Sequence, residues 1–143
     1  MSRAGALSGK LTPREKRKHC SRKGIGTMIK RNGSFRRDLR QEMRGGDGEI
    51  LIQHIWEPGT ELRSNTRMFA KLTINPGCSI GKHVHDQEEE IFYILSGTAE
   101  FSDNGTQVVL NPGDSARTGG GEAHSIRNIG TEPVELIAFI GRF

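Results

Sequence analysis

The sequence predicts an all-β domain, and three observations lead to this fold class. Beyond residue 48, short runs rich in apolar residues recur about every eight to twelve residues. Turn-forming groups such as Asn75-Pro76-Gly77 separate these runs. Asn104-Gly105 lies between two extended runs, which is a strong hairpin signal. Together they predict about eight to ten short antiparallel strands in a sandwich or barrel.

The positive charge of the chain is concentrated at its N-terminus. Residues 1–27 carry eight Lys or Arg against Glu15 alone, net +7, whereas residues 28–143 carry thirteen against sixteen acidic residues, net −3. The first segment has few large apolar residues and no periodicity, so we expect a disordered basic tail. A solvated tail, an arm that contacts nucleic acid and a targeting leader all suit this composition, and Met28 could be the natural start. The mildly acidic remainder does not indicate a nucleic-acid partner.

Residues 28–143 are enough for a single domain with a modest core. No apolar stretch is long enough to cross a bilayer, and the basic N-terminus lacks the apolar region of a secretory signal. We therefore expect a cytoplasmic protein without a membrane partner. Cys20 and Cys78 lie in unlike surroundings, which favours two free thiols over a disulfide.

A short helix is expected at the start of the domain. Ser34 could cap it, and Phe35, Leu39 and Met43 share one stripe at a spacing of four residues. Gly45-Gly46 would end it. The expected strands follow in order at residues 50–56, 66–74, 90–95, 98–102, 106–110, 115–118, 124–128 and 134–140.

Two of these strands, residues 90–95 and 134–140, are apolar on both faces. A strand of an antiparallel sheet with one solvated face should alternate instead. A second subunit is the simplest cover for the extra apolar face, so we expect a homodimer built by sheet packing across a two-fold axis.

A candidate metal site lies in the middle of the chain. His83 and His85 are separated by one residue, so on an extended strand their rings lie on the same face and can converge. Three glutamates, residues 88–90, follow; Glu89 should point to the opposite face, which leaves Glu88 and Glu90. His124 follows a glycine-rich loop and would complete a cluster of three imidazoles and a carboxylate. His54 has no such pattern around it and is expected to be a packed side chain.

The spacing of these residues resembles that of the cupin superfamily. The first cupin motif, G-x5-H-x-H-x4-E-x6-G in the form matched here, is met in full by Gly77, His83, His85, Glu90 and Gly97. The second motif, G-x5-P-x-G-x2-H-x3-N, is met by Gly113, Gly121, His124 and Asn128, with Gly119 at the proline position. The departure concerns a turn and not a ligand.

The resemblance implies a small jelly-roll barrel over roughly residues 49–140, with one divalent metal bound by His83, His85, Glu90 and His124. Imidazole and carboxylate donors suit Fe, Mn, Ni, Co or Zn. Occupancy should fall at acid pH because the imidazoles must be neutral. An apolar interior is expected from Met68, Ala70, Leu72, Phe92, Ile94 and Phe139.

Two functions are compatible with this family resemblance, since the fold does not define the substrate. The first is a metalloenzyme acting on a small oxygenated or carboxylated molecule by dioxygenation, decarboxylation, isomerisation or lyase chemistry. The second is a non-catalytic cupin that binds a metal or small ligand as a sensor, storage module or partner subunit. The sequence assigns no general acid or base. Polar candidates for holding an anionic substrate are Arg67, Arg117, Arg127 and Tyr93.

Overall fold

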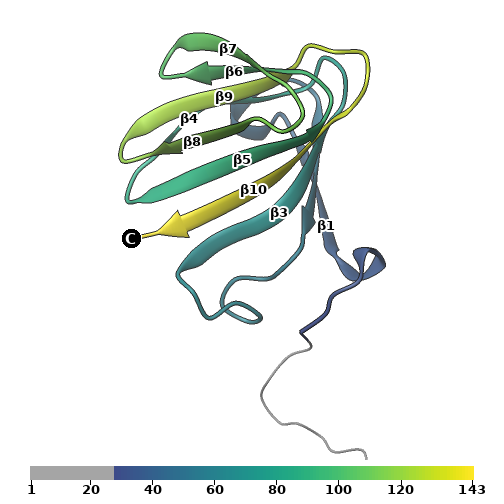
Figure 1. Ribbon diagram of the computed structural model, residues 1–143, viewed down its shortest axis with the longest axis vertical. Helices are drawn as coiled ribbons and strands as arrows, with labels where there is room; N and C mark the ends of the chain where they lie inside the picture. The colour runs from purple at the N-terminus through teal and green to yellow at the C-terminus, as the bar shows by residue number, and fades with distance from the viewer. Residues whose placement is uncertain (1–27) are drawn as a thin grey trace, which may run out of the picture.

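The computed structural model describes residues 28–143, which form two antiparallel sheets (Figure 1). The larger sheet has the strand order β1-β2-β3-β10-β5-β8, and the smaller has the order β4-β9-β6-β7. The strands are β1 (Arg36–Gln41), β2 (Glu49–His54), β3 (Thr66–Ile74), β4 (Ser79–His85), β5 (Glu88–Ser96), β6 (Ala99–Asp103), β7 (Thr106–Leu110), β8 (Ser115–Gly119), β9 (Glu122–Asn128) and β10 (Val134–Arg142). The predictions for the basic tail and for Cys20 lie outside the described residues.

The all-β prediction is confirmed, and its strands agree closely with the structure. Each of the eight expected strands overlaps one of β2, β3 and β5 to β10, and β3 and β7 have the expected bounds. Asn104 and Gly105 join β6 to β7 with φ values of 48° and 97°. Positive φ at both central residues is the requirement of the tight hairpin turn that Asn-Gly favours.

The expected N-terminal helix is wrong. Residues 36–41 form β1, an edge strand paired with β2 from Arg36↔His54 to Gln41↔Glu49. Two short 3-10 turns, η1 (Asn32–Ser34) and η2 (Met43–Gly45), flank it. Leu39 is 54% exposed, so the apolar stripe of the expected helix has no core to bury against. Pairing with β2 instead provides hydrogen-bond partners for the backbone N–H and C=O groups along one edge of this segment.

The expected closed barrel is also wrong. Within residues 28–143 no ladder of backbone hydrogen bonds joins the two sheets, so they form a sandwich. Buried aliphatic and aromatic side chains from both sheets fill the space between them. Packed sheets lie about 10 Å apart, roughly twice the spacing of paired strands, so a filled core keeps the facing edges from pairing. A pocket lined by residues of both sheets lies between them.

A β-bulge in β3 redirects one side chain that matters below. Met68 pairs with Ile140, but Thr66 pairs with Gly141, so Arg67 is the extra residue on β3. A bulge bends the strand and re-aims its side chain. Arg67 consequently lines the pocket between the sheets.

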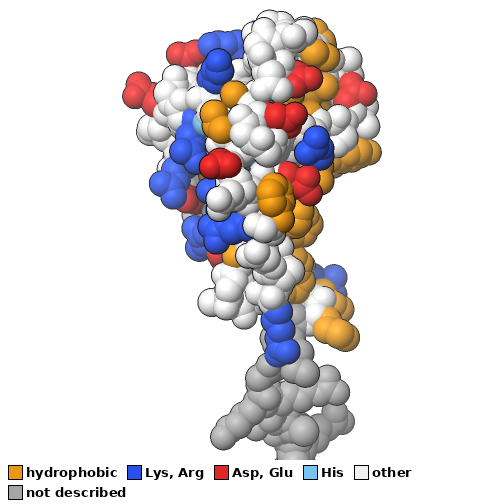
Figure 2. Space-filling model, turned by 90° about the vertical axis from the view of Figure 1, so that its left-hand side faces the viewer, with side chains coloured by type: hydrophobic (Ala, Val, Ile, Leu, Met, Phe, Trp, Pro, Cys, Tyr) orange, Lys and Arg blue, Asp and Glu red, His pale blue; other side chains and the backbone are white. Residues whose placement is uncertain are grey.

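The outer face of the larger sheet is apolar along β5 and β10. Tyr93 and Leu95 are 46% and 43% exposed, and Ile91, Ile137 and Phe139 are partly exposed on the same face. Hydrophobic side chains gather along one edge of the molecule in Figure 2, and Lys and Arg side chains along the other. The smaller sheet covers only the inner face of β5 and β10, so nothing among residues 28–143 covers their outer apolar face. No helix in residues 28–143 is long and apolar enough to span a membrane.

Candidate metal centre

Three strands bring the four expected ligands together. His83 on β4 pairs directly with His124 on β9, and His85 lies two residues beyond His83 on the same strand. Directly opposed residues of an antiparallel pair share a face, so these imidazoles point to the same side. Glu90 reaches the cluster from β5 in the larger sheet. The cluster therefore bridges the two layers of the sandwich.

The donor atoms of these residues converge on one point. The three Nε2 atoms lie 3.1 Å (His83 to His85), 3.2 Å (His85 to His124) and 3.1 Å (His83 to His124) apart. Glu90 Oε2 lies 2.9 Å from Nε2 of His85, 3.0 Å from that of His124 and 3.8 Å from that of His83. All four donor atoms lie within 4.8 Å of one another.

These separations suit a transition-metal ion. Two nitrogen ligands about 2.1 Å from one ion are about 3.0 Å apart at right angles and about 3.4 Å apart at the tetrahedral angle. The spacing of 3.1 to 3.2 Å between the imidazoles is nearer to the right-angle value. Four ligands arranged in this way leave open positions on an octahedral ion, which is the arrangement that a substrate or ligand needs.

The second nitrogen of each imidazole has its own partner. Nδ1 lies 2.9 Å from the Gly81 carbonyl oxygen in His83, 2.9 Å from Glu88 Oε1 in His85 and 3.0 Å from Thr118 Oγ1 in His124. A proton on Nδ1 would satisfy the carbonyl and the carboxylate, so the lone pair of Nε2 is presented to the centre. Three such lone pairs and a carboxylate oxygen facing one point call for a cation between them.

Burial and mutual contacts act in opposite directions on the pKa values of the cluster. Burial alone would raise the pKa of Glu90, but the contacts from His124, His83 and His85 outweigh it and lower that pKa far below its ordinary value. Contact with the Glu90 carboxylate raises the pKa of His85 against the effect of burial. Burial lowers the pKa of His124 more than Glu90 raises it. The carboxylate is thus held ionised, as a metal ligand must be.

Glu88 and Glu89 take other roles. Glu88, the alternative ligand by strand parity, is outside the four-residue cluster because its Oε1 faces Nδ1 of His85. The same oxygen lies 2.8 Å from Nη2 of Arg67. Glu89 lies 3.5 Å from Arg117 on the exposed face, as its parity predicts.

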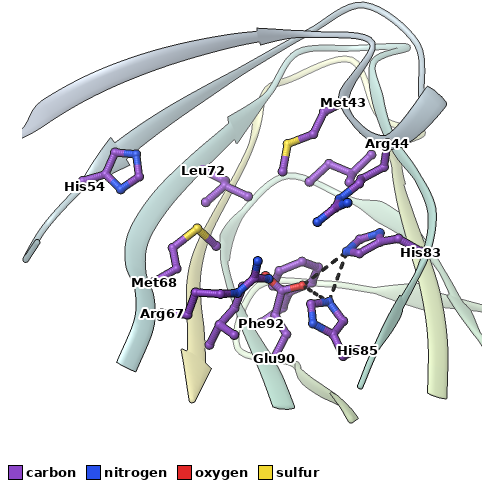
Figure 3. A pocket seen from close by; sticks show the side chains of 12 residues that line it. Met43, Arg44, His54, Arg67, Met68, Leu72, His83, His85, Glu90 and Phe92 are labelled. Carbon is purple, nitrogen blue, oxygen red and sulfur yellow. Dashed lines mark hydrogen bonds and ion pairs between the residues drawn. The ribbon is translucent and has the colours of Figure 1, made fainter. Parts of the chain in front are cut away.

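Three members of the cluster, His83, His85 and Glu90, form one end of a pocket of about 150 Å³ (Figure 3). Arg44 and Arg67 are close to the cluster in this view, and Met43, Met68 and Leu72 lead away from it toward His54. The full set of lining residues is Met43, Arg44, His54, Arg67, Met68, Leu72, Ile80, His83, His85, Glu90, Phe92 and Ile140. The pocket therefore combines two guanidinium groups with an otherwise mainly apolar wall.

The sequence-based expectations for the pocket wall are met only in part. Met68, Leu72 and Phe92 line it, whereas Ala70 and Ile94 are buried in the core away from it. The prediction that Phe139 lines the interior is wrong. Phe139 alternates with the buried Ala138 and Ile140 along β10 and therefore faces outward.

Among the candidate anion-binding residues, the structure places only Arg67 in the pocket. Arg117 pairs with Glu89, Arg127 pairs with Asp47, and Tyr93 is on the outer face. Sequence reasoning missed Arg44, which η2 directs inward with a positive φ of 57°. His54 is not one of the clustered donors, as expected, yet it lines the pocket.

Comparisons with known proteins agree with the fold and with the resemblance to the cupins. A family model described as "Cupin domain" matches residues 70–140. An oxalate-binding protein from Thermotoga maritima is 38% identical over 119 residues, covering 83% of this chain and 97% of that protein. A crystal structure from Thermotoga maritima, described as a predicted oxalate decarboxylase, is 37% identical, has a TM-score of 0.76 and aligns with 81% of this chain and all (100%) of that one. A cupin domain from Schizosaccharomyces pombe has a TM-score of 0.61 at 18% identity, covering 74% of this chain and 69% of that one, and shows the fold alone.

Proposed function

The chain belongs to the cupin family, and from this premise we propose that it is a metal-dependent binding protein for a small carboxylate anion of the oxalate class. One observation carries the proposal: three of the four converging metal donors, His83, His85 and Glu90, line the same pocket as two arginines, Arg44 and Arg67. The 38% identical relative that is named for oxalate binding supports the choice of anion.

The metal is proposed to be a divalent ion of Fe, Mn, Co, Ni or Zn, held by His83, His85, Glu90 and His124. When bound, such an ion supplies a Lewis acid that attracts carboxylate oxygens to its open positions. The protein supplies the rest of the recognition. The apolar walls from Phe92, Ile80 and Ile140 exclude water, which strengthens electrostatic contacts inside the pocket.

Arg67 is prepared to bind the part of the anion that the metal does not hold. Its Nη2 is bound to Glu88, which fixes the guanidinium group, and its Nε is buried without a partner. A guanidinium group presents its donors in a planar fork that matches a carboxylate. Arg44 adds a second positive charge beside the cluster (Figure 3). The anion would therefore be neutralised from two sides.

A metalloenzyme for the same class of molecule is the second candidate, because one similar structure is described as a predicted oxalate decarboxylase. Such a reaction needs a proton-transferring group besides the ligands. Glu90 is the only carboxylate among the described lining residues, and it belongs to the ligand cluster. The non-ligand histidine, His54, lies at the opposite end of the pocket (Figure 3). Binding is therefore the first choice. The cytoplasmic location and the homodimer are further parts of the proposal.

The test begins with metal analysis of protein purified without a histidine tag, followed by calorimetric titration with oxalate. Glycolate forms the same five-membered chelate with a metal but lacks the second carboxylate, so it is the reference ligand. We expect oxalate to bind the metal-loaded protein, and Arg67→Gln to weaken that binding about tenfold or more without changing the metal content. Arg142→Gln is the matched control, because Arg142 approaches the same Glu88 from outside the pocket at 3.9 Å. Oxalate binding that is absent, or that needs no metal, would contradict the proposal; carbon dioxide release or oxygen uptake would favour the enzyme.

A further inference from the structure

A second hollow, lined by residues of β1, η2, β2 and β3, continues from the pocket that contains the metal donors. A second cavity of about 400 Å³ adjoins that pocket of about 150 Å³. Four residues line both cavities: Met43, Arg44, His54 and Met68. The space therefore runs from the histidine cluster to the inner side of β1, where Asp38 and Arg40 line it. Oxalate, which has no methylene group between its carboxylates, would fill only the end at the metal donors.

The middle of this space is apolar. Met43 on η2 and Met68 and Leu72 on β3 lie between the cluster and His54 (Figure 3). Methionine side chains adapt to ligands of different shapes, and aliphatic groups gain free energy when they leave water for such a surface. The methionine and leucine side chains of this section suit methylene groups, and Arg44, which lines both cavities, borders it.

Where the two cavities join, one lining side chain has a polar atom without a partner. Nε2 of His54 is buried and unpaired, and among residues 28–143 the only other such side-chain atom is Nε of Arg67, which lines the same pocket. Buried polar atoms are nearly always hydrogen-bonded in folded proteins. Burial, aided by the positive charge of Arg36, lowers the pKa of His54. A neutral imidazole can exchange one hydrogen bond with a ligand at this position.

We propose that the pocket accepts an aliphatic acid longer than oxalate, with a second hydrogen-bonding group at its far end. The carboxylate head lies at the metal donors and Arg67, the methylene body lies against Met43 and Met68, and the terminal group binds His54. The placement of the carboxylate head rests on the proposed function. The placement of the methylene body and of the terminal group depends only on the residues that line the two cavities.

A series of dicarboxylates tests the length. Calorimetry on the metal-loaded full chain would compare oxalate, malonate, succinate, glutarate and adipate. We expect the affinity to be highest for a member longer than oxalate. An affinity that falls steadily from oxalate onward would overturn the inference and leave the proposed function intact. No binding of any member would instead contradict the proposed function, and the inference with it.

Substitution of His54 tests the far end. His54→Leu should weaken the preferred longer acid about tenfold relative to oxalate, which is the effect of losing one hydrogen bond to a charged group. His54→Gln keeps a hydrogen-bond donor at this position, so it should restore most of the affinity for the longer acid relative to oxalate. Arg37→Gln is the control, since Arg37 alternates with the inward residues of β1 and lies opposite Gln53. Equal weakening of oxalate and the longer acid would overturn the inference. If His54→Leu does not fold, the ratio measured for His54→Gln and the dicarboxylate series still decide it.

Discussion

Glu88 contacts His85 from the side opposite the metal donors: its Oε1 lies 2.9 Å from Nδ1 of that histidine. The same oxygen lies 2.8 Å from Nη2 of Arg67. One carboxylate therefore contacts both a donor residue of the candidate metal centre and the pocket arginine Arg67. A metal-bound histidine commonly depends on such a partner for its tautomer and orientation. Under the proposed function, metal binding and anion binding are therefore linked through this side chain.

The first prediction concerns Glu88 itself. Glu88→Gln should weaken metal binding about tenfold, because an amide cannot hold the Nδ1 proton of His85 as strongly as a carboxylate. The affinity can be measured by competition with a coloured chelator. Glu135→Gln is a suitable control, since that carboxylate is also ion-paired, to Lys71 at 2.7 Å, but on the outer face. Equal affinities for the two variants would show that Glu88 does not position the ligand.

The second prediction separates two neighbouring carboxylates. Glu90 is buried with its Oε2 among three imidazoles, whereas Glu89 points outward toward Arg117. Glu90→Gln should lose most of the bound metal in elemental analysis, because it removes a charged ligand. Glu89→Gln should retain the metal content of the parent chain. Retention of the metal by both variants would place the site elsewhere.

The third prediction concerns pH and His54. Burial lowers the pKa of His54 in the folded chain, so the unfolded chain binds this proton more readily. The contribution of His54 to stability is therefore complete above its unfolded pKa of about 6.5 and is lost as the pH falls through that value toward the folded pKa. Urea unfolding of metal-free protein at several pH values should show a steeper loss for the parent chain than for His54→Gln. Stability profiles against pH that run parallel for the parent chain and His54→Gln would contradict this prediction.

Much of the candidate site could be predicted from the sequence because its donor residues are close in sequence or occur in short motifs. His83 and His85 share a strand face by parity, and the motif spacing selected Glu90 and His124. Arg44 could not be found in this way, since the direction of its side chain depends on its own left-handed backbone conformation in η2. The second role of Glu88 also depends on contacts between β5 and the bulge in β3.

The fold was predictable where turn chemistry and alternation agree, as in the hairpin at Asn104-Gly105. The prediction failed at residues 34–43, where three apolar residues at helical spacing also suit an edge strand. Whether this segment forms a helix or a strand depends on β2, whose edge is free to pair with β1. Gly119 at the proline position of the second motif also has a tertiary reason. A Cβ at this position would lie 2.7 Å from Cβ of Glu89.

The last prediction tests the homodimer through the outer face of β5 and β10. Leu95 and Tyr93 are exposed there beside Ile91, Ile137 and Phe139, and burying such a face is favourable. We expect the chain to elute as a dimer in size-exclusion chromatography with light scattering, and Leu95→Lys to shift it toward the monomer, since an unpaired charge in an apolar interface is costly. Val109→Lys is the matched control, because Val109 is 52% exposed on the smaller sheet. A parent chain that is monomeric at high micromolar concentration would contradict the proposal, and an equal shift in both variants would place the interface elsewhere.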